Sequence, residues 1–199
     1  MDLLTELTTT DLRPLRRRAS DLYLSAVARV EPDALALPTP CPDWTLHGLL
    51  RHQVSQDQGF AAAAKGEGDR LSAWHGGDLG ESPYAAARAS ADLVTRAFAD
   101  LSLDAELALP ELGGRFPAAL AVSFHLVDLV VHAWDVAAAI GVPWEPADDL
   151  VAASLKVAAL VPEAGRGPGA SFGPPVPAAD GAAGRDGLLA LLGRDPAWR

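Results

Sequence analysis

The stretch PAALAVSFHLVDLVVHAWDVAAAI, residues 117–140, decides the fold class of this chain. It predicts a helix that is apolar around most of its circumference, and Gly141 follows it as a stop signal. Such a helix is buried among other helices or spans a bilayer. Aspartate and histidine interrupt the run before it reaches the roughly 18 consecutive apolar residues of a membrane span. We therefore predict the central helix of a helical bundle.

Helical spacing and capping signals predict further helices on both sides of this one. They cover residues 11–30, 46–65, 83–101, 147–161 and, as a short last helix, 185–193. Thr45, or Asp43 just before it, is a typical helix N-cap, and Ser82-Pro83 is a typical helix start. The arginines at 16–18 are interpreted as a solvated helix face.

The predicted fold is all-α, an up-down four-helix bundle with a short C-terminal extension. The bundle covers residues 1–145. Residues 146–199 are expected to form a C-terminal helix and tail that pack on the bundle and are not an independent domain. The extension consists of an extended piece and a short helix. Within the bundle, Trp74 is expected to anchor the glycine-rich loop 66–82, and the connector around Pro110 is expected to hold a short extended piece.

The charge balance narrows the classes of partner. The formal net charge is −10 and the sequence pI is near 4.8, so the chain repels phosphate backbones and anionic bilayers. We expect a small-molecule substrate, no nucleic acid and no membrane, and the apolar tail suggests a homodimer. Cys41 is the single cysteine, which excludes an internal disulfide, and we interpret it as a buried, small apolar side chain. The N-terminus lacks the apolar segment of a secretory signal, which favours a cytoplasmic protein.

Four ionisable residues lie within the apolar helix. Asp128 and His132 are one turn apart with an offset of about 40°, and His125 and His132 are two turns apart with an offset of about 20°. They share one face of a buried helix, where unpaired polar groups cost several kcal/mol. Either a core polar network or a metal ion can satisfy them. Both interpretations stay open from this pattern alone.

A third residue of the right type lies on another predicted helix. His52 is in the first turns of the helix at 46–65, which can face the middle of the apolar helix in an antiparallel bundle. Two imidazoles and one carboxylate form an open catalytic site for zinc or a similar divalent ion. The prediction is a metal site made of His52, Asp128 and His132.

Two stretches carry a resemblance to a known family. PTPCPDWTLHGLLRH at 38–52, with DLVVHAWDVAAAIG at 128–141, resembles the mycothiol-dependent maleylpyruvate isomerase N-terminal family, within the DinB-like metal-binding four-helix bundles. The resemblance implies a DinB-like bundle in which His52, Asp128 and His132 hold the metal. This chain has Asp128 where the isomerase pattern has glutamate, and its C-terminal tail is shorter and differently patterned.

The resemblance also implies a chemistry. A divalent metal, most naturally zinc, can bind a low-molecular-weight thiol such as mycothiol as the thiolate and so produce a nucleophile at neutral pH. The predicted activity is a thiol-dependent transferase or isomerase acting on a small electrophile. The alternatives are a non-catalytic small-ligand-binding bundle with a structural or vestigial metal site, and a metal-independent tailoring enzyme.

Three further residues are candidates for supporting roles. Gln56 can orient a metal-bound water or substrate, or it is a surface glutamine. His125 is a fourth ligand, a base or a satisfied core histidine. Asp135 orients an imidazole or forms a salt bridge to an arginine of another helix.

Overall fold

The computed structural model describes residues 2–163, 166–167, 172–177 and 183–199. The α-helices are α1 (Leu3–Thr9), α2 (Arg13–Val27), α3 (Leu46–Ala64), α4 (Pro83–Ala99), α5 (Ala118–Ala139), α6 (Asp148–Ala158) and α7 (Gly184–Leu191). Two strands, β1 (Glu106–Leu109) and β2 (Gly114–Pro117), form an antiparallel hairpin. Short 3-10 helices are η1 (Pro32–Ala36), η2 (Leu71–Trp74) and η3 (Pro110–Leu112).

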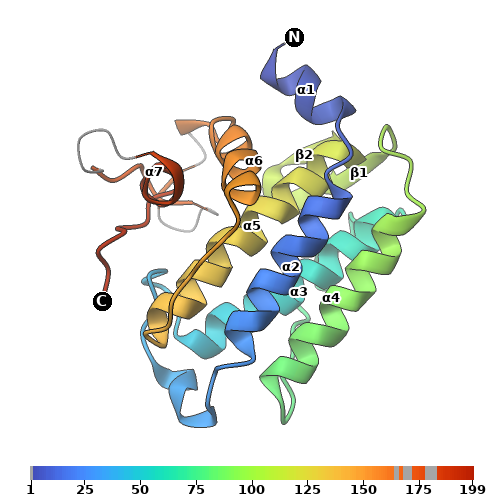
Figure 1. Cartoon of the computed structure of the whole chain (residues 1–199). Helices are drawn as coiled ribbons and strands as arrows, with labels where there is room; N and C mark the ends of the chain where they lie inside the picture. The colour runs from blue at the N-terminus through green and yellow to red at the C-terminus, as the bar shows by residue number, and fades with distance from the viewer. Residues whose placement is uncertain (1, 164–165, 168–171, 178–182) are drawn as a thin grey trace.

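Helices α2, α3, α4 and α5 lie side by side and form the bundle (Figure 1). The most extensive packing joins α2 to α5 and α3 to α4. Helix α5 is long and apolar enough to cross a membrane, but 89% of its apolar window is buried inside the protein. The predicted all-α fold is confirmed, and the apolar helix is its central member.

The capping signals act as predicted. The Thr45 hydroxyl accepts a hydrogen bond from the Gly48 N–H at the start of α3, and the Ser82 hydroxyl accepts one from the Ala85 N–H at the start of α4. Trp74 is 2% exposed and donates from Nε1 to the Gly68 carbonyl, so it anchors the glycine-rich loop. The extended piece predicted around Pro110 is the hairpin β1–β2, which leads directly into α5.

The N-terminal boundary differs from the prediction. A separate helix, α1, precedes α2 and starts at Leu3; the carboxylate of the N-cap residue Asp2 accepts a hydrogen bond from the Thr5 N–H. Helix α2 begins at Arg13, not residue 11. The guanidinium of Arg13 donates to three carbonyls at the end of α4, which satisfies backbone groups that a helix C-terminus leaves unpaired.

A buried polar chain, here called the cross-brace, connects all four bundle helices. Arg16 of α2 donates from Nε to Nδ1 of His125 on α5 over 3.0 Å. Nε2 of His125 lies 2.8 Å from Oδ1 of Asp57 on α3, and Ser90 of α4 donates to Oδ2 of Asp57 over 2.7 Å. Because the Arg16 N–H can only donate, His125 accepts at Nδ1 and carries its proton on Nε2. The interpretation of arginines 16–18 as a solvated face is wrong for Arg16, which is 1% exposed.

The cross-brace keeps its charges paired in the core. Burial lowers the pKa of Arg16 to about 10, so the guanidinium remains a cation at neutral pH. Burial and the nearby Arg16 both lower the pKa of His125, so this imidazole is neutral. Each pair of donor and acceptor fits only one relative position of the helices, and the cross-brace therefore fixes the register in which α3 faces α5.

The C-terminal segment lies along one side of α5 (Figure 1). Helix α6 packs on α5, and α7 packs on α6. The tail that is expected to pack on the bundle falls partly outside the described residues. Within its described part, Phe172 packs against the core and the Val176 N–H donates to the Ala190 carbonyl.

We expect Arg16→Met to lower the free energy of unfolding by about 3–5 kcal/mol, because it removes one partner of a buried ionic network. The matched control is Arg17→Met, one position along the same helix at an exposed site, which should change stability by no more than about 0.5 kcal/mol. Urea unfolding followed by circular dichroism measures both. Equal stability of the two variants would contradict the cross-brace.

Candidate metal centre

The predicted site residues come together between α3 and α5. One ligand atom from each of His52, Asp128 and His132 lies within 4.8 Å of the others. Asp128 and His132 are one helical turn apart, and Oδ1 of Asp128 is 3.2 Å from Nε2 of His132. The His52 ring meets the His132 ring edge-on, with centroids 5.4 Å apart. We call these three residues the candidate metal group.

The approach to α3 positions His52. The Pro38–Thr45 bridge and the Thr45 cap fix where the helix begins, and His52 follows two turns later. Trp44, just before the cap, packs against the His52 ring with centroids 4.3 Å apart. The segment before α3 therefore positions the His52 imidazole in two ways. It fixes where the helix backbone begins, and it supplies the Trp44 ring that packs against the imidazole.

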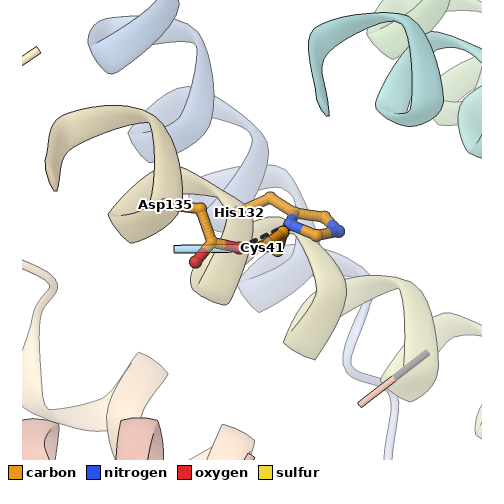
Figure 2. Close-up of side chains that lie close together, drawn as sticks. All are labelled: Cys41, His132 and Asp135. Atoms are coloured by element: carbon orange, nitrogen blue, oxygen red, sulfur yellow. Dashed lines mark hydrogen bonds and ion pairs between the residues drawn. The ribbon is translucent and has the colours of Figure 1, made fainter. Parts of the chain in front are cut away.

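The other side of His132 is filled by a second group of polar residues. Nδ1 of His132 is 2.8 Å from Oδ2 of Asp135, and Sγ of Cys41 is 3.2 Å from the same oxygen. Figure 2 shows these three side chains meeting beside α5. Arg194, from the segment after α7, donates from Nη2 to both Oδ2 of Asp135, over 3.2 Å, and Sγ of Cys41, over 3.3 Å.

The two groups around His132 differ in whether an arginine contacts them. Cys41, His132 and Asp135 also lie close enough to share an ion, but the Arg194 guanidinium already supplies a cation to two of them. Oδ2 of Asp128 in the candidate metal group and Oδ1 of Asp135 in the other group are both buried without a partner among the residues that the structure describes, so the Arg194 contact is what distinguishes the two groups. Two imidazoles and a carboxylate are a donor set typical of open zinc sites, so a divalent ion fits this group.

The charges of the site are strongly coupled. Burial lowers the pKa of His52 to about 4, and the charge of the neighbouring His132 adds to this effect. Burial opposes protonation of His132 as well, but attraction to Asp128 and hydrogen bonds to both Asp128 and Asp135 raise its pKa well above 6.5. Burial works to raise the pKa of Asp128, yet the attraction of His132 lowers it below 3.8. Without an ion, the proton on His132 balances the acidic groups beside it.

The supporting candidates occupy different places. Gln56 is 7% exposed and donates from Nε2 to Oε2 of Glu111 over 2.8 Å, so it is not a surface glutamine and connects α3 to the hairpin region. Both ring nitrogens of His125 are engaged in the cross-brace. Asp135 makes both contacts considered for it, one to an imidazole and one to an arginine.

Some residues of the site were missed from the sequence. The interpretation of Cys41 as a buried apolar side chain is wrong, because it is half-buried and its sulfur contacts Asp135 and Arg194. Arg194 follows the last helix, 59 residues after its partner Asp135, and no local pattern marks it. Asp57 lies within the mainly polar segment HQVSQDQ of α3. Because most of its neighbours in the sequence are also polar, hydrophobic periodicity does not indicate that Asp57 is buried.

Comparison with known proteins places the fold in a family. The family sequence model of the mycothiol maleylpyruvate isomerase N-terminal domain matches residues 16–137, which run from α2 to α5. The chain belongs to this family. The match contains α3 and α4 completely, most of α2 and α5, and all three residues of the candidate metal group.

Two relatives extend the family likeness beyond the bundle. The uncharacterized proteins Rv0738 and MT0763, from two strains of Mycobacterium tuberculosis, are each 31% identical to this chain over 186 residues, 89% of this chain and 94% of theirs. Because 89% of the chain cannot lie within residues 1–137, the alignment continues into the C-terminal segment. This kind of C-terminal segment is therefore not confined to this chain.

A solved structure shares the fold. It is a crystal structure of a variant of mycothiol-dependent maleylpyruvate isomerase in which a histidine is replaced by alanine. The TM-score is 0.59 at 16% identity, with 86% of this chain and 74% of that chain covered. At this identity the likeness shows the family's fold alone.

We expect the pKa values of the two imidazoles of the site to be displaced in opposite directions in chelator-treated protein. His132 should be an imidazolium at pH 7, because its pKa is raised. His52, with a pKa of about 4, should stay neutral down to about pH 5. The stabilisation from protonated His132 is complete below pH 6.5 and is lost as the pH rises through its raised pKa.

Side-chain NMR of protein labelled with nitrogen-15 in histidine measures both states, with His52→Ala and His132→Ala used to assign the signals. A neutral His132 ring at pH 6.5, or an imidazolium signal from His52 at that pH, would contradict the charge arrangement described here.

Proposed function

We propose that this protein binds a divalent metal ion, most naturally zinc, and uses a mycothiol-type thiol in a transferase or isomerase reaction on a small electrophile. The observation that carries the proposal is the convergence of His52, Asp128 and His132 from two helices. Their donor set suits an open zinc site, and a buried oxygen of Asp128 lacks a partner among the described residues. The family name links the same domain to a mycothiol-dependent isomerase.

Each residue has a definite task in this proposal. His52 and His132 supply neutral imidazole nitrogens, and Asp128 supplies one negative charge. In the neutral ring, Asp135 accepts a hydrogen bond from Nδ1–H of His132 and so leaves Nε2 as the metal ligand. Trp44 holds the His52 ring in place. When bound, the ion lowers the pKa of a coordinated thiol and stabilises negative charge that develops on the electrophile.

The reaction class is proposed more broadly than the isomerase's own name. Asp128 is one methylene shorter than the glutamate of the isomerase pattern. About a quarter of the solved isomerase chain has no counterpart here, since the superposition covers 74% of it. We therefore propose thiol-dependent chemistry on a small electrophile and do not extend it to maleylpyruvate. The net charge of −10 supports a protein without nucleic acid or an anionic membrane as a partner, and we propose a cytoplasmic location.

Metal binding is the first test, made on protein without a histidine tag. The wild type should bind about one zinc ion per chain. His52→Ala and His132→Ala should each weaken zinc binding by at least about 100-fold, the upper end of what the loss of a supporting contact costs. The exposed histidine 47 provides the matched control, since His47→Ala should leave zinc binding unchanged.

Calorimetric titration measures the affinity, and elemental analysis measures the metal content. Retention of the wild-type metal content in both site variants would overturn the proposed site.

Thiol binding is the second test. Cobalt-loaded protein should develop a sulfur-to-cobalt charge-transfer band when mycothiol is added, because the thiolate takes the open position of the ion. The S-methylated thiol is the control and should give no band. Absence of the band with free thiol, in protein that holds one cobalt ion, would leave the ion a structural role and contradict thiol-dependent catalysis.

A further inference from the structure

Asp135 is a fully buried carboxylate, and the arginine that contacts it comes from the far end of the chain. It is 0% exposed, and its Oδ2 meets three groups: Nδ1 of His132, Sγ of Cys41 and Nη2 of Arg194. Removal of the cation that pairs with a buried carboxylate strongly destabilises the folded protein. Arg194 therefore supplies a charge that this side of the site requires.

Arg194 is held in place by its own segment. It is 5% exposed, its Nη1 donates to the Leu192 carbonyl over 2.9 Å, and its guanidinium lies over the Phe172 ring at 5.5 Å. Its Nη2 bridges Asp135 and Cys41. Burial acts to lower the pKa of Arg194, but attraction to Asp135 raises it above its ordinary value. The guanidinium is thus a fixed internal cation.

His132 stands between two groups that could each share an ion. On its Nε2 side lie His52 and Asp128; on its Nδ1 side lie Cys41 and Asp135. A neutral imidazole offers one lone pair, and the hydrogen bond at one nitrogen decides that the other is the ligand. The two groups therefore compete for the same ring. A thiolate, an imidazole and a carboxylate are also good ligands for zinc, so the donor set alone does not choose between them.

We propose that Arg194 makes this choice: it is a positioning residue that fills the Cys41–Asp135 side of His132 with an internal cation and so directs the divalent ion to Nε2, beside His52 and Asp128. This inference rests on the proposed metal-binding function and adds a task for the C-terminal segment. With Arg194 in place, an ion on the Nδ1 side would meet a guanidinium in contact with two of its three ligands. Without Arg194, the same three ligands become an open site.

The test is the ligand set of cobalt bound to the whole chain without added thiol. Wild-type protein should show no sulfur-to-cobalt band, because its ligands are nitrogen and oxygen. Arg194→Met should show that band, because Cys41 loses its thiol proton to the solvent and binds the ion as thiolate. Adding Cys41→Ala to Arg194→Met should abolish the band. A purely structural role of Arg194 would change stability but not the identity of the ligand atoms.

Two controls separate charge from packing. Arg185→Met removes another arginine of the C-terminal segment, one that donates to the Trp144 carbonyl and makes no contact with Asp135 among the described residues. It should leave the cobalt spectrum unchanged. Arg194→Lys keeps a cation at the site and should show no sulfur band or a strongly reduced one. If Arg194→Met does not fold, Arg194→Gln tests the same loss of charge with a polar side chain.

The outcomes divide clearly. A sulfur band in the neutral variants that is absent from wild type supports the proposal, as does nitrogen-15 NMR of the zinc forms if coordination moves from Nε2 of His132 to Nδ1. A wild-type spectrum in the neutral variants overturns it, and so does a Cys41-dependent band in the wild type. If wild type binds no cobalt, the proposed function fails on its own. The role of Arg194 is then supported only if the neutral variants gain a Cys41-dependent site.

Discussion

Helix α5 carries four ionisable side chains into the interior of an apolar bundle, and each must find a partner there. His125 and Asp135 are 0% exposed, and the side chain of Asp128 is 19% exposed. Because water is excluded from most of this region, charge has to be balanced by other helices or by a bound ion. The positions of Arg16, Arg194 and His52 all follow from this requirement. The pairing of buried polar groups therefore determines the arrangement of the bundle as much as aliphatic packing does.

The helix meets the requirement in three different ways along its length. At His125 the partners are Arg16 and Asp57, and both ring nitrogens are engaged within the protein. At Asp135 the partner is Arg194, brought by the C-terminal segment. Between them, Oδ2 of Asp128 has no partner among the described residues. Asp128 makes no contact with an arginine among the described residues, and the proposed ion would supply the cation that Arg194 gives to Asp135.

Much of this arrangement could be predicted from the sequence, for reasons that are local. The apolar run around His125 and His132 predicts a buried helix, and the caps at Thr45 and Ser82 predict where α3 and α4 begin. The one-turn spacing of Asp128 and His132 predicts a shared face, and the bundle topology brings His52 to it. These inferences depend on periodicity and capping, which act over a few residues.

The rest depends on contacts between distant parts of the chain. Arg16 lies in a run of three arginines, and only the packing of α2 against α5 decides that it is buried while Arg17 is exposed. Likewise, Arg194 and Cys41 meet across 153 residues, so neither position carries a signal of the other.

The proposed ion binds among His52, Asp128 and His132. Anomalous diffraction at the zinc absorption edge, from crystals of untagged protein grown with zinc, tests it most directly. We predict one strong anomalous peak about 2 Å from a nitrogen of His52, Nε2 of His132 and an oxygen of Asp128. A peak beside Cys41 and Asp135 instead, or no peak in the bundle at full zinc saturation, would contradict it.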